Sequence, residues 1–208
     1  MTLRFCGRFR VCGIKSIALC EKNQPDVWEE LCKSLSVGKC KVTIIVTLVL
    51  YQLLQRRAIK RFCGKCKKEW ETELQVKVVS VLEKLFGCQV QGEINCYIGL
   101  YPTYIRNINK HFFLLPYGVS HDRLREIIIH ELSHFYCYEA CGNSLPSDKL
   151  WLLSEQIVPY ILRYIIGSEN KGVCYTEEES MRDGSLYRSW VGGIISFREL
   201  LIALKQNE

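Results

Sequence analysis

The chain has 208 residues, of which 48% are hydrophobic and 24% are charged. This composition excludes disorder throughout and leaves room for one domain with an extension or for two small domains. The charge is unevenly divided, because residues 1–68 hold 15 Lys and Arg against 4 Asp and Glu, whereas residues 69–208 hold 13 against 18. The asymmetry predicts a basic N-terminal extension at 1–68 and a second domain, with a different surface, at 69–208.

The basic extension is predicted to be mainly helical. A capping signal at Pro25-Asp26 starts one expected helix, which ends near Gly38. The apolar run Val42–Leu54 has polar residues at every fourth position, which favours a second helix. Such a helix is about 21 Å long, short of the ~30 Å hydrocarbon core of a bilayer, so a buried core helix is expected. A membrane-spanning or membrane-lying segment is the alternative.

Partners of the extension follow from its charge. Arginines and lysines crowd the stretch Arg56–Lys68. They favour contact with an anionic membrane surface or with nucleic acid, and a solvated lysine-rich face is the alternative.

The second part is predicted to be α+β. Segments with apolar residues at helical spacing alternate with two segments rich in aromatic and β-branched residues, which are typical of strands. The expected elements are a helix at 70–87, strands at 94–101 and 111–117 joined by a loop at 102–110, and helices at 120–138, 147–167 and 186–201. Ser120 and Ser147 are expected to cap their helices. Pro159 is expected to kink the second of these helices.

The chain contains twelve cysteines with no evident secreted framework. Its first apolar stretch is interrupted by Lys15, which makes a poor signal peptide. We therefore expect reduced thiols and a cytoplasmic location, with membrane association through the extension as an option. Cys63 and Cys66 have C-x-x-C spacing, but the next cysteines are at the wrong distance for a structural zinc site. A metal or redox role for this pair stays an alternative.

The segment His130-Glu131-Leu132-Ser133-His134 carries the strongest chemical signal. On a helix His130 and His134 lie one turn apart on one face, so both imidazoles can reach one metal ion. Glu131 lies about 100° around the axis, where a general base for a metal-activated water is expected. Burying these groups among apolar neighbours is costly unless something binds them. The motif therefore predicts a metal site, with hydrogen-bonded core histidines as the alternative.

The segment Ile129–Phe135 resembles the active-site helix of the zincin metallopeptidases. Cys137 and Ala140 occupy the positions of the glycine and the third histidine of the metzincin branch, so the resemblance is to the gluzincin branch. In that branch a glutamate of the next helix completes the site, and residues 152–156, which contain Glu155, are similar to that second helix. Ser154 stands where many gluzincins have Asn, and Pro159 stands where they have Asp. The group that steadies a ligand histidine is therefore not predicted.

The resemblance covers about Trp70 to Gly167 and implies a zincin-like minimal metallopeptidase domain. It implies Zn²⁺ as cofactor, a peptide or protein as substrate, and hydrolysis of the peptide bond. It also implies that substrate pairs as an added strand along His111–Leu115. A tyrosine that stabilises the oxyanion is expected, and the candidates are Tyr160, Tyr164, Tyr175 and Tyr187.

Glu155 is the preferred third ligand. It lies among apolar residues, where an unpartnered carboxylate is costly to bury, and a short connection makes its helix a neighbour of the His130–His134 helix. Glu139 is about 180° around the helix from His130 and points away. Residues Glu177–Glu179 fall in a polar stretch that predicts a solvated loop.

Two other functions compete with the peptidase hypothesis. One is a catalytically silent zincin fold that acts as a metal-dependent sensor or protein-interaction module, although the intact Glu131 argues against it. The other is an adaptor for a membrane surface or nucleic acid, in which residues 1–68 carry the function.

Overall fold

The computed structural model describes residues 1–6, 46, 50, 54–99, 106–141, 147–167 and 185–205. These residues form an α+β arrangement with one four-stranded sheet, which confirms the predicted class at that level. They fall into two compact units. The first, here the sheet unit, is Thr2–Thr72 with Gly92–Leu124; the second, here the helical unit, is Glu73–Gln91 with Arg125–Glu208. The predicted helix at 25–38 and most of the apolar run at 42–54 lie outside the described residues.

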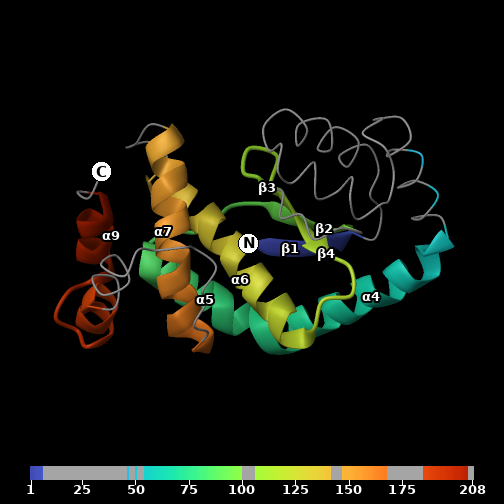
Figure 1. The fold of residues 1–208 in the computed structure, drawn as a ribbon, viewed down its shortest axis with the longest axis horizontal. Coiled ribbons are helices and arrows are strands. Elements are labelled where there is room, and N and C mark those ends of the chain that lie inside the picture. Colours follow the sequence, from blue (N-terminus) through green and yellow to red (C-terminus); the bar gives the residue numbers. More distant parts are fainter. Residues whose placement is uncertain are drawn as a thin grey trace. The chain divides into compact units, whose positions relative to one another are not determined.

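The sheet unit contains four strands in the order β1-β2-β4-β3 (Figure 1). They are β1 (Thr2–Cys6), β2 (Glu93–Gly99), β3 (Arg106–Asn107) and β4 (Phe112–Pro116). The two predicted strands correspond to β2 and β4. They pair parallel to each other, and β3 folds back antiparallel on β4. Every residue of β4 is buried, as expected for a strand inside a sheet.

Strand β1 was not predicted, and it comes from the N-terminal extension. It pairs parallel with β2, so that Leu3 is opposite Ile94 and Phe5 is opposite Cys96. Leu3 is buried between exposed neighbours, which is the alternation of a strand with one covered face. Residues 1–68 therefore supply a strand to the same unit as β2 and β4, and their separation as an extension stays a prediction.

The edge of β4 corrects the idea that all of His111–Leu115 accepts an added strand. On one side β4 pairs with β2, and on the other Phe112 and Phe113 pair with Asn107 and Arg106 of β3. Arg106 and Asn107, from the end of the expected loop, thus pair with the main chain of those two residues. An incoming peptide cannot pair along the whole segment while β3 is in place.

Helix α4 (Arg56–Glu69) contacts β1 and passes through a π-helical turn, η1 (Trp70–Leu74), into α5 (Gln75–Phe86). Ile59 and Cys66 of α4 are buried, and its Phe62 meets Tyr117 edge-to-face at 5.3 Å between ring centroids. The predicted end of the helix at 70–87 is confirmed, because Gly87 takes the left-handed conformation at φ 65° directly after α5. The described residues contain no helix that is both long enough and apolar enough to cross a bilayer.

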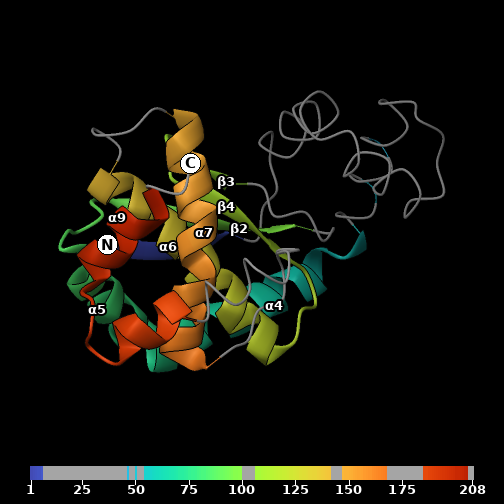
Figure 2. The same ribbon diagram turned by 60° about the vertical axis from the view of Figure 1, so that its left-hand side comes forward.

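The helical unit is built around α6 (His121–Cys141) and α7 (Ser147–Ile166), which lie side by side (Figures 1 and 2). The first turn of α6 belongs to the sheet unit. Ser120 caps α6 as predicted, because its hydroxyl accepts from the Arg123 N–H at 3.3 Å. Helix α6 runs to Cys141, three residues beyond the predicted end. Helix α7 begins and ends within one residue of its predicted bounds. It continues through Pro159, and the expected kink there stays a prediction.

The predicted single helix at 186–201 is wrong, since the structure has one helix at 185–191 and a second, α9 (Phe197–Lys205). Gly193, at φ 75°, adopts a left-handed conformation that ends the first helix. Ser196 and Glu199 then form a reciprocal capping box. The Ser196 N–H donates to the Glu199 carboxylate at 2.6 Å, and the Glu199 N–H donates to the Ser196 hydroxyl at 3.2 Å.

Candidate metal centre

Helix α6 brings two histidine side chains together. His130 and His134 are four residues apart, so they share one helix face, and their Nε2 atoms are 3.1 Å apart. The helix is held in place by a buried apolar surface that includes Ile128, Ile129 and Leu132. Local sequence thus orients the two rings, and core packing fixes the helix that carries them.

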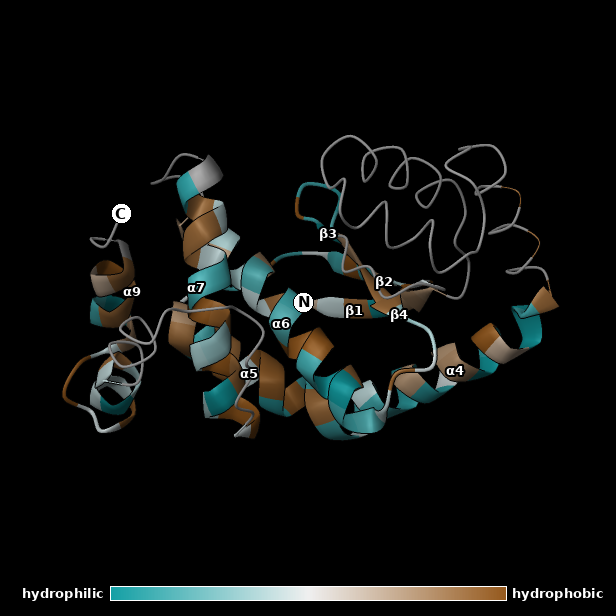
Figure 3. Ribbon diagram, viewed as in Figure 1, coloured by the Kyte–Doolittle hydropathy of each residue, from teal (hydrophilic) through white to brown (hydrophobic). Residues whose placement is uncertain are grey.

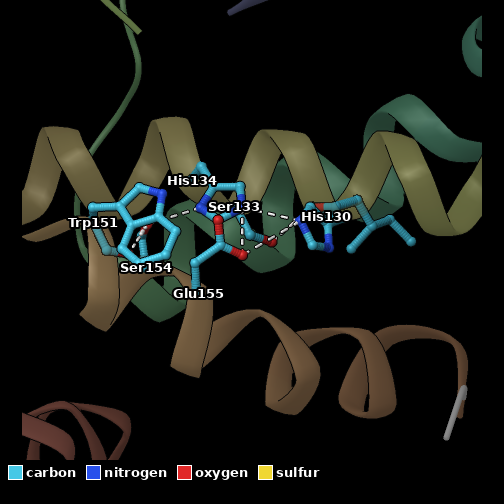
Figure 4. A network of polar contacts seen from close by, with 7 residues as sticks. His130, Ser133, His134, Trp151, Ser154 and Glu155 are labelled. Atoms are coloured by element: carbon cyan, nitrogen blue, oxygen red, sulfur yellow. Dashed lines mark hydrogen bonds and ion pairs between the residues drawn. The ribbon is translucent and has the colours of Figure 1, made fainter. Parts of the chain in front are cut away.

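Helix α7 adds a carboxylate to the pair. The Oε2 atom of Glu155 lies 3.9 Å from His130 Nε2 and 3.7 Å from His134 Nε2. Figure 4 shows the Glu155 side chain reaching from its helix toward both rings. The ligand atoms of the three residues all lie within 4.8 Å of one another, and no other such group of potential ligands occurs among the described residues. The structure therefore assembles the three residues that the sequence nominated as ligands.

The spacing of these three atoms suits a small divalent cation. A circle drawn through them has a radius of about 2.1 Å, close to the roughly 2.0–2.2 Å bonds that zinc forms with imidazole and carboxylate. Two imidazole nitrogens and one carboxylate oxygen are also a donor set that zinc accepts in catalytic sites. The residues present therefore fit a zinc ion.

The three candidate ligands differ in exposure. The His134 side chain is 0% exposed, whereas the side chains of His130 and Glu155 are 30% and 26% exposed. One side of the group is thus sealed by the core, and the other is open to solvent. A catalytic zinc site needs such an open side, because a water molecule and the substrate must reach the metal.

Ser154 orients the inner histidine, a role that sequence analysis did not assign. Its hydroxyl donates to the Trp151 carbonyl at 2.7 Å, so its oxygen accepts from His134 Nδ1, which lies 2.9 Å away (Figure 4). With the proton of a neutral imidazole on Nδ1, the Nε2 lone pair faces His130 and Glu155. The only sequence signal for this role of Ser154 was its position directly before Glu155.

Glu131 is buried in the helical unit, with 1% of its surface exposed. It follows His130 directly, which places it about 100° around the helix from that ligand. It is not one of the three residues whose ligand atoms converge. Its neighbour Ser133 is also buried and bonds back to the Ile129 carbonyl at 2.7 Å, so this hydroxyl is satisfied within the helix.

Of the rival carboxylates, Glu139 is described and is not one of the three converging residues. Helix α6 continues through Glu139, whose side chain is exposed. Residues Glu177–Glu179 lie outside the described part of the chain.

The tyrosine candidates make aromatic contacts in the helical unit. Tyr164 packs on Trp190 with ring centroids 4.8 Å apart, and Tyr160 and Tyr187 lie 6.2 Å apart. The Arg163 guanidinium stacks on the Tyr187 ring at 4.4 Å. Tyr175 lies outside the described residues. None of these contacts selects one tyrosine for the oxyanion.

The pair Cys63 and Cys66 offers a poor alternative metal site. None of the seven described cysteines is part of a disulfide. Burial raises the pKa of the Cys66 thiol to about 12 and also raises the pKa of Cys63. Metals bind the thiolate, so raised pKa values oppose binding at this pair.

No protein-family model, curated protein or solved structure matches the chain.

Proposed function

We propose that the chain is a zinc-dependent peptidase whose site is formed by His130, His134, Glu131 and Glu155. The observation that carries the proposal is the convergence of two histidines and one glutamate from adjacent helices on a point open to solvent. The resemblance to gluzincins adds the same roles for the same residues. A further support is the His134–Ser154 contact, which prepares a neutral imidazole for metal binding.

We assign the residues the following roles. His130, His134 and Glu155 would hold the zinc, and Ser154 keeps the inner imidazole in the binding tautomer. The ion would supply a water whose pKa is lowered to about 7 and would polarise the peptide carbonyl. Glu131 removes a proton from the attacking water and then delivers it to the nitrogen of the leaving amine. The net reaction adds one water across the peptide bond.

The decisive experiment changes the base and leaves the ligands intact. Glu131→Gln keeps the size of the side chain but cannot take a proton. We expect about one zinc per chain in wild type and in this variant, with hydrolysis of a peptide library or denatured protein reduced at least ~100-fold in the variant. Glu139→Gln, an exposed change on the same helix, is the matched control and should hydrolyse like wild type.

The same measurements separate a peptidase from a metal-dependent sensor. Zinc in the wild-type protein without hydrolysis of any peptide would favour the sensor or protein-interaction module. Hydrolysis that is unchanged in Glu131→Gln would exclude the proposed mechanism, whatever the metal content.

A further inference from the structure

Helix α4 carries a cationic face. Seven of its residues are basic and exposed: Arg56, Arg57, Lys60, Arg61, Lys65, Lys67 and Lys68. The helix has one acidic residue, Glu69, and this residue is buried. Within the described part of the chain, an ion pair is seen for only one of the seven cations, Lys67, which contacts Glu71 at 3.6 Å. Among the described residues, most of the positive charge on this face thus has no acidic partner.

The arrangement around the helix axis is strongly one-sided. At about 100° per residue, the seven basic residues occupy one half of the circumference, and the buried Ile59 and Cys66 fall in the other half. The helix contacts β1 of the same unit. Figure 3 shows the hydrophilic residues returning at each turn along α4. The outer half is thus a continuous basic strip along the whole helix.

This strip has an electrostatic cost in the isolated molecule. Three pairs of like charges are four residues apart, namely Arg56 with Lys60, Arg57 with Arg61, and Arg61 with Lys65, and such pairs destabilise a helix. Two arginines also stand in the first turn, which has no acidic residue, where the helix dipole disfavours positive charge. An anionic surface laid along the strip would relieve both effects.

Apolar residues beside the strip identify the type of anionic surface. Leu54, two residues before α4 begins, is 81% exposed, and Val46 and Leu50, at spacings of four, are also exposed and helical. Phosphates of nucleic acid gain nothing from exposed leucine, whereas a bilayer offers an acyl region next to its charged headgroups. We propose that the cationic face of α4, together with Leu54, binds the surface of an anionic lipid bilayer. This docking goes beyond peptide hydrolysis and does not depend on it.

The charge requirement is tested with the full chain and lipid vesicles. We expect sedimentation with vesicles of mixed phosphatidylglycerol and phosphatidylcholine, no sedimentation with pure phosphatidylcholine, and weaker binding as salt rises. The triple variant Arg57→Gln, Arg61→Gln, Lys65→Gln should bind on the order of 100-fold more weakly. The matched control changes three exposed lysines elsewhere to Gln: Lys77, Lys84 and Lys110. If the control loses as much vesicle binding, the effect depends on net charge alone and the proposal is overturned.

The apolar requirement separates a membrane from nucleic acid. Leu54→Ser should weaken vesicle binding on the order of 10-fold, because a leucine no longer enters the acyl boundary. Ile194→Ser, which changes a residue that is 79% exposed on another segment, should have no effect. Binding to duplex DNA or single-stranded RNA but not to the anionic vesicles would overturn the proposal in favour of nucleic acid. Absence of binding to either at low salt would leave the strip a solvated surface and would also overturn it.

Discussion

His134 Nδ1 and Ser154 Oγ lie 2.9 Å apart, and this contact decides which nitrogen of His134 faces Glu155. The Ser154 hydroxyl is committed to the Trp151 carbonyl, so its oxygen is left to accept the imidazole proton. Nε2 is then free of a proton and turned toward the other two candidate ligands. A residue that is not a candidate ligand thus sets the protonation of one that is.

The first prediction is that Ser154→Ala weakens zinc binding by roughly 10–100-fold without abolishing it. Loss of the acceptor at Nδ1 removes the preference for the binding tautomer and the restraint on the ring. Competition with a chelator of known affinity measures the change. Ser154→Thr keeps the hydroxyl and should recover most of the affinity.

Ser133→Ala is the control for that experiment. Ser133 is equally buried, but its hydroxyl bonds to the Ile129 carbonyl within α6. Its removal should leave zinc affinity unchanged. If both alanine variants lose the same affinity, a general loss of packing explains the result and the orienting role of Ser154 is refuted.

The second prediction concerns the third ligand. Glu155→Ala should weaken zinc binding by more than the roughly 10–100-fold expected at Ser154, because it removes a ligand and not its support. Glu139→Ala should bind zinc like wild type, since its side chain is exposed beyond the histidines on α6. Equal affinities in the two variants would exclude Glu155, and a bound structure with its carboxylate more than about 4 Å from the metal would do the same.

The third prediction locates the metal. His130→Ala with His134→Ala should remove most of the zinc measured by elemental analysis. Cys63→Ser with Cys66→Ser should retain about one zinc per chain, because burial keeps both thiols protonated at neutral pH. The opposite pattern would place the metal at the cysteine pair and end the proposal for the histidines.

The fourth prediction is a pH effect on stability at the capping box of α9. Hydrogen bonds from Ser196 lower the pKa of the Glu199 carboxyl below its usual 4.5. A carboxyl with a lowered folded-state pKa contributes stability above its unfolded pKa, and that contribution is lost as pH falls through the folded value. The melting temperature of Glu199→Gln should therefore be lower than that of wild type at pH 7, and the gap should narrow as the pH falls below 4.5 and through the lowered folded-state pKa.

Local signals predicted much of the helical structure. Ser120, Gly87 and the residues near Gly167 marked helix ends correctly because caps and left-handed glycines act through neighbouring residues. Gly192-Gly193 and Ser196–Glu199 are similar end and start signals, but they were overlooked because apolar residues continue at helical spacing across them. Strand β1 is a different case, because its partner β2 lies about 90 residues away and no local pattern specifies such a pairing.

The parts of the candidate site that depend on nearby residues in the sequence were predicted most fully. His130 and His134 belong to one helix turn, so their spacing alone predicts that they meet. Glu155 required the packing of a second helix, and the choice rested on its apolar surroundings. The role of Ser154 could not be predicted, because serine hydroxyls commonly serve as helix caps or in turns. The role became clear only from the position of its hydroxyl beside the His134 ring.

The pairing of β1 with β2 has a practical consequence for any recombinant form of this protein. Residues Thr2–Cys6 form the outer strand of the sheet, and the Thr2 N–H also donates to the Gly92 carbonyl at 3.1 Å. Trimming the first six residues would expose the hydrogen-bonding groups of β2 beside the buried Ile94 and Cys96, and such an apolar open edge recruits other chains into aggregates. Residues Thr2–Cys6 therefore need to be kept in any recombinant form.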